Sequence, residues 1–210
     1  MVINKIGWHH LAYGMNCQDA GWETEGLKAV CDGCSEGKHS EVGAKGFCHL
    51  LETGLPPAEA FVKLTALFGQ TPDSIRDYLC FTVLLVRETA EAFILTYCGD
   101  GYVLGGETQD GRFLTQELEG GEYPPYYAYR YVDAALLSRY REGAAFRTRR
   151  FSKHWYKNIG IASDGIRYLQ RKPAIYEEFT HLLQCGKASA VKRLINREQK
   201  LCKDDITIVI

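Results

Sequence analysis

The chain has 210 residues, 46% of them hydrophobic and 24% charged, which suits a single domain (residues 1–210) with a sizeable core. Its net charge of −1 gives no reason to expect binding to nucleic acid or to an anionic membrane surface. No apolar run approaches the ~20 residues that span a bilayer. The N-terminal residues lack the apolar core of a signal peptide, so we expect a cytoplasmic protein.

The first part of the chain indicates two strands followed by two helices. Ile3 to Ala12 is partly apolar, Gly26 to Cys31 is more strongly so, and we expect a strand in each. From Glu41 onward, apolar residues recur at helical spacing until the break at Gly54 to Pro57. Pro57 suits the first turn of a second helix, whose apolar positions again share one face.

The middle of the chain is rich in strand patterns. We expect strands over five ranges: Tyr78 to Val86, Ala92 to Cys98, Tyr102 to Leu104, Phe113 to Leu118 and Tyr126 to Val132. Gln109-Asp110-Gly111 is typical of a hairpin turn. Two helices should follow Gly165, and Ile206 to Ile210 should close the chain as a strand. This order predicts an α+β fold, an antiparallel β-sandwich flanked by helix pairs.

The segment from Ala134 to Lys157 gives no clear secondary-structure pattern. It contains a basic cluster of four residues: Arg147, Arg149, Arg150 and Lys153. The simpler interpretation is a solvated face, and the alternative is a surface that attracts a phosphorylated partner.

Aspartates end or precede three of the expected strands, far apart in the sequence: Asp32, Asp164 and Asp204. Each has a structural interpretation when taken alone, because Asp-Gly is a common turn and an aspartate often caps an element. Carboxylates that converge at one edge of a sheet repel one another unless a cation lies between them. Hard divalent ions such as Mg²⁺ and Mn²⁺ prefer oxygen ligands, so the pattern favours an acidic metal cluster.

The eight cysteines are scattered, mostly in apolar surroundings, and we expect reduced thiols within the core. Cys31 and Cys34 form a C-x-x-C pair, and His39 is a further possible zinc ligand. A zinc site would need a second ligand pair at suitable spacing, which the sequence does not offer. A redox role is also disfavoured, since Asp-Gly fills the middle of the pair.

The aspartate pattern resembles the metal-dependent protein phosphatases of the 2C type, and the resemblance covers nearly the whole chain. Five segments carry it, in the order that the family has: Val30 to Gly33, Thr82, Tyr97 to Gly101, Ile161 to Gly165 and Asp204 to Thr207. Any one of them is a weak signal, but five in the same order are a strong one.

The N-terminal region narrows the resemblance to a mostly bacterial branch. His10 followed by Cys17-Gln18-Asp19-Ala20 is similar to the Ser-His and Cys-Gln-Asp-Ala segments of that branch, and Ser40 to Ala44 is similar to its helix start. In better-known members, an arginine and a glutamate stand where this chain has Gly14 and Gln18. That arginine holds substrate phosphate, and the glutamate adds negative charge beside the second ion.

The resemblance implies hydrolysis of phosphate monoesters, usually phosphoserine or phosphothreonine in a protein. Two divalent ions, Mn²⁺ or Mg²⁺, would share a bridging water that attacks phosphorus in line. The residues that the resemblance assigns to the ions are Asp19, Asp32, the Gly33 carbonyl, Asp164 and Asp204. Asp32, Asp164 and Asp204 are also the implied catalytic set, and His10 is a candidate for substrate binding.

Two functions therefore remain open from the sequence. The first is an active phosphatase, which the three core aspartates favour. The second is a catalytically weak or inactive phosphatase-like module that binds a phosphorylated partner, an alternative that Gly14 and Gln18 keep open. Asp100, which lies between two glycines, is interpreted as a structural residue of a tight turn.

Overall fold

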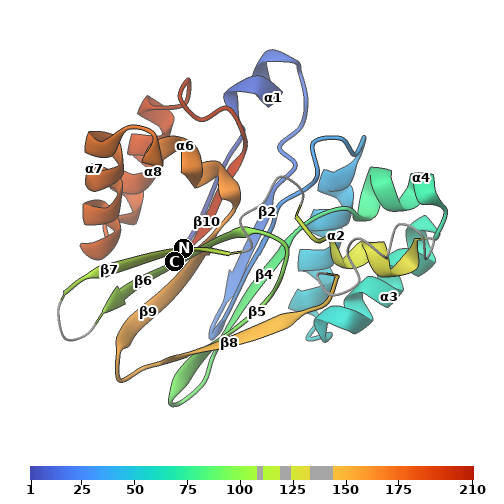
Figure 1. Ribbon diagram of the computed structural model, residues 1–210, viewed down its shortest axis with the longest axis horizontal. Helices are drawn as coiled ribbons and strands as arrows, with labels where there is room; N and C mark the ends of the chain where they lie inside the picture. The colour runs from blue at the N-terminus through green and yellow to red at the C-terminus, as the bar shows by residue number, and fades with distance from the viewer. Residues whose placement is uncertain (108–110, 119–123, 133–143) are drawn as a thin grey trace.

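The computed structural model describes residues 1–107, 111–118, 124–132 and 144–210. Within these residues, two five-stranded antiparallel sheets lie face to face (Figure 1). The first sheet contains, in spatial order, β1 (Val2–Lys5), β10 (Ile206–Val209), β9 (Tyr156–Ala162), β6 (Gly101–Glu107) and β7 (Phe113–Leu118). The second contains β2 (Ala20–Thr24), β3 (Leu27–Cys31), β4 (Val83–Glu88), β5 (Ala92–Cys98) and β8 (Arg147–Ser152).

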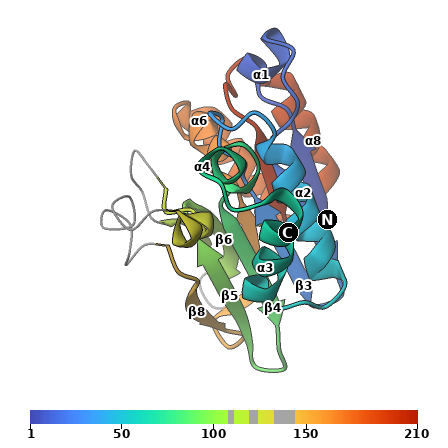
Figure 2. The same ribbon diagram turned by 90° about the vertical axis from the view of Figure 1, so that its right-hand side faces the viewer.

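Helices cover the outer face of each sheet, which confirms the predicted α+β sandwich. The first sheet is covered by α6 (Arg167–Gln170), α7 (Pro173–Gln184) and α8 (Ala188–Arg197). The second is covered by α2 (Ser40–Glu52), α3 (Pro57–Phe68), α4 (Pro72–Ser74) and a π-helical turn (Ile75–Leu79) (Figure 2). Among the described residues, no helix has both the length and the apolar character needed to cross a bilayer.

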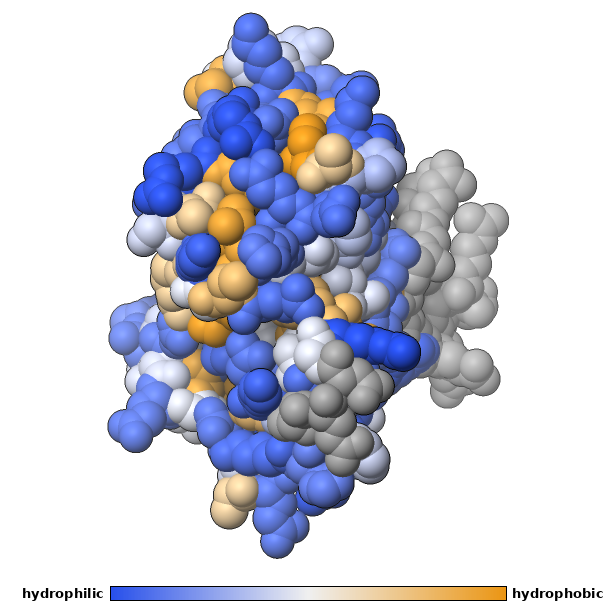
Figure 3. Space-filling model, turned by 90° about the vertical axis from the view of Figure 1, so that its left-hand side faces the viewer, coloured by the Kyte–Doolittle hydropathy of each residue, from blue (hydrophilic) through white to orange (hydrophobic). Residues whose placement is uncertain are grey.

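Alternation along the strands explains why they are apolar on both sides. In β4, Val83 and Leu85 pack toward the helices, whereas Leu84 and Val86 pack into the space between the sheets. Successive side chains of a strand point to opposite faces, so a strand in the middle of four layers has no polar face. The surface over α7 and α8 is mainly hydrophilic, with apolar groups confined to narrower strips (Figure 3).

The long helices form where the spacing of apolar residues predicts them. Pro57 occupies the first turn of α3, where its missing N–H costs no hydrogen bond. Phe61 of α3 is completely buried, and its ring lies 4.9 Å from that of Phe47, 5.0 Å from Phe81 and 4.8 Å from Tyr127. This aromatic cluster fixes α2 and α3 on the second sheet.

The first predicted strand is wrong in its second half. Residues from Ile3 begin in β1, but the chain then forms a short helix, α1 (Trp8–Ala12). Gly7 lies at the junction, where a Cβ atom would overlap the backbone of Asp204. The backbone N–H of Trp8 donates to the Cys202 carbonyl at 2.7 Å, so a contact distant in sequence ends the strand. The sequence analysis also missed β2.

Two further strand predictions are wrong because apolar runs do not by themselves distinguish strands from buried helical turns. The range Tyr78 to Val86 begins in the π-helical turn and becomes a strand only at Val83. Tyr126 to Val132 contains a 3₁₀ helix (Tyr127–Tyr131), in which Tyr127 packs under α3. Arg147 begins β8, an edge strand that basic residues made hard to recognise. The predicted hairpin turn lies largely outside the described residues.

Two glycines of α2 provide a test of this packing. A Cβ atom at Gly43 would overlap the Tyr78 carbonyl oxygen, whereas one at Gly46 would meet only the flexible end of Leu64, at 3.2 Å. We expect Gly43→Ala to lower the free energy of unfolding by about 1–3 kcal/mol. Gly46→Ala, the matched control, should leave it unchanged or raise it by up to ~1 kcal/mol. Urea titration measures both, and equal effects of the two variants would contradict the packing described.

Candidate metal centre

The antiparallel register brings four aspartates to one end of the sandwich. Ala20 pairs with Cys31, so Asp19, just before β2, lies beside Asp32, just after β3. Ile208 pairs with Ala162, so Asp164, beyond the end of β9, lies near Asp204, ahead of β10. Residues from both ends of the chain therefore meet at one rim.

A cavity opens at this end between the two sheets. Its described lining residues are Asp32, Gly33, Cys34, Ser35, Thr82, Asp100, Pro124, Tyr126, Asp164, Arg167 and Asp204. Asp19 does not line the cavity but lies beside Asp32 through the pairing of β2 with β3. The structure thus brings together all the acidic residues that the sequence analysis assigned to the ions.

Asp32 is held through its own backbone by Thr82. The Thr82 N–H donates to the Asp32 carbonyl at 2.8 Å, and the Asp32 N–H donates to the Thr82 hydroxyl at 3.3 Å. At Gly33, a Cβ atom would lie 2.7 Å from both the Gln18 carbonyl oxygen and the Ser40 hydroxyl. Only glycine permits this close approach, so the Asp-Gly pair positions the carboxylate and admits the neighbouring chain.

Asp19 is fixed by a serine that the sequence analysis did not single out. The Ser163 hydroxyl donates to Asp19 Oδ2 at 2.7 Å and accepts from the Thr207 N–H at 2.9 Å. Asp19 is 1% exposed, and its Oδ1 has no hydrogen-bond partner among the described residues. A buried carboxylate oxygen without a partner is costly unless something positive binds it.

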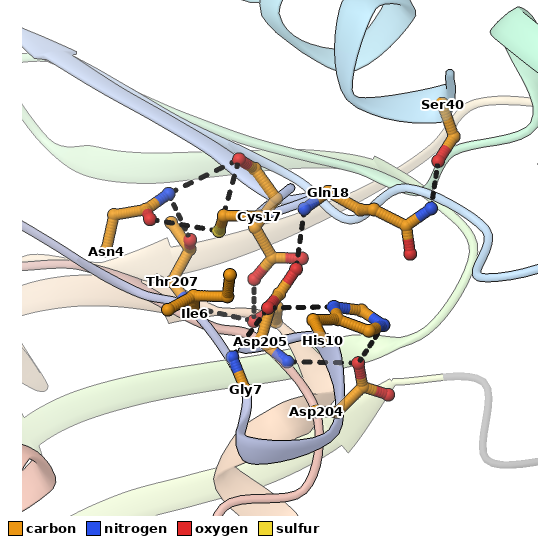
Figure 4. Close-up of polar contacts among 12 residues, drawn as sticks. Asn4, Ile6, Gly7, His10, Cys17, Gln18, Ser40, Asp204, Asp205 and Thr207 are labelled. Carbon is orange, nitrogen blue, oxygen red and sulfur yellow. Dashed lines mark hydrogen bonds and ion pairs between the residues drawn. The ribbon is translucent and has the colours of Figure 1, made fainter. Parts of the chain in front are cut away.

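Asp205 organises the polar contacts behind Asp204 (Figure 4). Its carboxylate accepts from the backbone N–H of Gly7 at 2.7 Å and of Gln18 at 2.6 Å. The His10 ring lies 2.9 Å from Asp205 through Nδ1 and 3.8 Å from Asp204 through Nε2. His10 is buried and is not among the described lining residues, so its ring faces the two aspartates.

Gln18 points away from the carboxylates, toward the start of α2 (Figure 4). Its Nε2 donates to the carbonyl oxygens of Cys34 and Gly37, each at 3.2 Å, and to the Ser40 hydroxyl at 3.1 Å. Gly14 has φ = +66°, in the left-handed region that favours glycine, and has no side chain that could reach the cavity. Neither position places a charge beside the cavity.

The pKa values of these carboxyl groups are raised, as expected for buried groups that repel one another. Burial, followed by the charges of Asp19, Asp164 and Asp204, raises the pKa of Asp32 well above its ordinary value. Burial and the charge of Asp205 raise the pKa of Asp19 to about 8. Burial also raises the pKa of Asp164 and of Asp204. Removal from water and crowding with like charges both disfavour the ionised form.

This donor set fits hard divalent cations. It offers carboxylate oxygens, a glycine that allows close backbone approach, and the unpartnered Asp19 Oδ1, and a cation would relieve the repulsion. Among the described residues, no three His, Cys, Asp or Glu side chains already stand in a coordinating arrangement.

The sequence analysis missed Arg167 and misjudged the surroundings of Asp100. Asp100 does lie in a tight turn, but its carboxylate also lines the cavity. Arg167 Nη2 lies 3.4 Å from Asp100 Oδ2 and 2.5 Å from Asp164 Oδ2. The available signal was spacing, because Arg167 follows Asp164 by three residues, one helical turn.

The possible zinc ligands do not converge. Cys31 is buried in the core with its sulfur 3.7 Å from that of Cys48, whereas Cys34 lines the acidic cavity. The His39 ring stacks on Tyr78. All eight cysteines are free thiols.

Comparison with known proteins agrees with this arrangement. The family model described as protein phosphatase 2C matches residues 6–201. No curated protein matches the chain in sequence.

Solved structures share the fold at low sequence identity. A bacterial serine phosphatase has a TM-score of 0.65 at 12% identity, covering 99% of this chain and 94% of that one. The serine/threonine phosphatase Stp1 from Staphylococcus aureus has a TM-score of 0.63 at 14% identity, covering 99% and 92%. The catalytic domain of the serine/threonine phosphatase PstP, solved with two manganese ions, has a TM-score of 0.56 at 16% identity, covering 99% and 94%.

The raised carboxyl pKa values predict that the ion-free protein loses stability as pH rises. The folded state retains protons that the unfolded chain releases above pH ~4, so the loss should extend from there to about pH 8, the pKa of Asp19. His10 acts in the same direction, because its pKa is also raised, chiefly by its hydrogen bond to Asp205. Asp205, with a lowered pKa, loses its contribution only in acid.

Thermal unfolding in a chelator between pH 5 and pH 8 measures this effect. We expect the melting temperature to fall by several degrees across the range, on the order of 2–4 °C for each kcal/mol. Asp32→Asn should flatten the slope, whereas Asp73→Asn, at an exposed position, should not. A melting temperature that rises with pH would contradict the electrostatics described.

The position of Gln18 gives a second prediction. Gln18→Glu replaces a buried amide donor by a carboxylate facing two carbonyl oxygens. We expect the free energy of unfolding to fall by about 1–3 kcal/mol. The Mn²⁺ concentration that half-saturates the protein should not decrease. Gln184→Glu, at an exposed amide that donates to Gly111, is the matched control and should be nearly neutral. Unchanged stability together with tighter Mn²⁺ binding would mean that residue 18 faces the ions.

Proposed function

Because the chain belongs to the protein phosphatase 2C family, we propose that it is a metal-dependent phosphoprotein phosphatase, with residues 1–210 as one catalytic domain. The observation that carries the proposal is the convergence of Asp32, Asp164 and Asp204 in one cavity. The proposed substrates are phosphoserine and phosphothreonine in proteins of the cytoplasm. Serine/threonine phosphatases among the structures of the same fold support this substrate class.

The residues that would hold two Mn²⁺ or Mg²⁺ ions are the carboxylates of Asp19, Asp32, Asp164 and Asp204, with the Gly33 carbonyl. The manganese-bound PstP domain supports the choice of ion. When bound, the ions would supply hydroxide near neutral pH and neutralise charge on the phosphoryl oxygens. The four carboxylates give four negative charges against the four positive charges of two ions, so the filled site would be close to neutral.

The remaining side chains hold this set in place. Thr82 fixes the backbone of Asp32, and Ser163 fixes the carboxylate of Asp19. His10 acts behind Asp204, because its ring lies against Asp205 at 2.9 Å and keeps the loop ahead of β10 in position. We therefore assign His10 to positioning, in place of the substrate contact expected from the sequence.

The second candidate function is a weak or inactive module that binds a phosphorylated partner. The observation favouring it is that positions 14 and 18 place no arginine and no carboxylate at the cavity. The two functions differ in turnover. Hydrolysis of p-nitrophenyl phosphate that depends on Mn²⁺ supports the phosphatase, whereas phosphopeptide binding without turnover supports the module.

The decisive variant is Asp32→Asn. An amide in place of this central carboxylate removes a negative charge that both ions need, so we expect Mn²⁺-dependent hydrolysis to fall by at least about 100-fold. Asp73→Asn, the matched control, should retain wild-type rates. Circular dichroism should show the same fold in both variants. Wild-type turnover of Asp32→Asn at saturating Mn²⁺ would exclude the assigned centre.

A further inference from the structure

A cation besides the metal ions would stabilise a phosphate group bound at this site. A phosphate monoester carries nearly two negative charges, and a planar guanidinium matches its oxygens in a bidentate manner. The arginine that better-known members use is Gly14 here, which has no side chain to offer. The chain must supply this charge from another position or bind phosphate without it.

Arg167 is the single cation among the described residues that line the acidic cavity. It begins α6, directly after a 3₁₀ turn (Asp164–Ile166). Side chains three residues apart nearly eclipse one another on a 3₁₀ turn, so Arg167 extends over Asp164. Its side chain is 35% exposed, which leaves the guanidinium open to the cavity.

The guanidinium is held on one side and has donors to spare. Both of its ion pairs, to Asp164 and to Asp100, use Nη2. Its Nε has no hydrogen-bond partner among the described residues. An arginine has five N–H donors, and the side chain is partly exposed at the cavity, so the donors that Asp164 and Asp100 leave unused are suited to a further anionic acceptor.

Asp100 provides the means to keep the guanidinium in place. Asp100 is 6% exposed and is fixed by a turn in which Gly99 and Gly101 both have positive φ. That turn carries the chain from β5 in one sheet to β6 in the other, so Asp100 approaches Arg167 from a rigid element. Asp164 is expected to be shared with an ion, whereas Asp100 can orient the arginine continuously.

We propose that Arg167 is the phosphate-binding residue of this site, with Asp100 as its positioning residue. The guanidinium would donate hydrogen bonds to the non-reacting phosphoryl oxygens and so replace the arginine absent at position 14. This inference rests on the proposed function, since it assigns the substrate contact within the same cavity.

The competing interpretation is a counter-ion that only neutralises Asp164 and Asp100. The two interpretations differ in what the loss of Arg167 changes. A counter-ion competes with divalent ions, so Arg167→Ala would bind Mg²⁺ more tightly and leave phosphate binding unchanged. If Arg167 binds phosphate, its loss weakens phosphate binding even when Mg²⁺ is saturating.

The test is calorimetric titration of inorganic phosphate into Mg²⁺-saturated protein, which needs no turnover. We expect Arg167→Ala to weaken phosphate binding roughly 10- to 100-fold. The affinity of Arg167→Lys should lie between those of the wild type and Arg167→Ala, because lysine keeps the charge but lacks the planar guanidinium that binds two oxygens at once. Arg171→Ala is the matched control. Arg171 ends the same helix and lies over the Tyr168 ring at 4.6 Å, outside the described cavity lining. This control should bind phosphate as the wild type does.

Kinetics with p-nitrophenyl phosphate provide the second readout. We expect Arg167→Ala to raise KM more than it lowers kcat, and Asp100→Asn to give a smaller effect of the same kind. Phosphate affinity within twofold of wild type in both Arg167 variants overturns the inference, as does a wild-type protein that binds no phosphate. A wild type that binds phosphate through Arg167 but hydrolyses nothing would refute the proposed function alone. If Arg167→Ala does not fold, Arg167→Lys and Asp100→Asn decide.

Discussion

Carboxyl groups crowded at one end of the sandwich repel one another, and the packing of the two sheets holds them there nonetheless. The pKa of Asp19, about 8, corresponds to a cost of several kcal/mol when the group is ionised. That cost is met by the burial of strands such as β3 and β9 between the four layers, where their core residues are completely buried. The fold thus holds these carboxyl groups in a crowded arrangement whose repulsion a bound cation would relieve.

A second constraint ties the beginning of the chain to its end. Asp205 accepts hydrogen bonds from the backbone N–H groups of Gly7 and Gln18 and lies 2.9 Å from Nδ1 of His10, so one buried carboxylate fixes both loops that flank the cavity. Asp205 differs from its neighbours because it is surrounded by donors, and its pKa is lowered in spite of burial. Two adjacent aspartates therefore have opposite tasks: Asp205 is a structural anion, and Asp204 remains available at the cavity.

Much of this arrangement follows from the sequence alone. Helices α2, α3, α7 and α8 were predictable because their apolar residues repeat at helical spacing, and Asp32, Asp164 and Asp204 because each lies at the end of an apolar strand. Several of the failures depend on contacts between distant segments, which no local pattern contains. The turn at Gly7 exists because the backbone of Asp204 lies against it, and Gln18 faces α2 because Cys34 and Gly37 present carbonyl oxygens there.

Arg167 shows how such distant contacts alter a site without altering its fold. A cation beside Asp164 is favourable in the ion-free protein, yet the same charge competes with the ions for that carboxylate. Asp100 resolves the competition, because it can keep the guanidinium when Asp164 is shared. An arginine on α6 approaches the cavity from the first sheet, whereas position 14 would approach it from the loop after α1. The same charge delivered from a helical turn is held by two carboxylates and by the 3₁₀ turn before it, and under the proposed role of Arg167 this placement would make an arginine at position 14 dispensable.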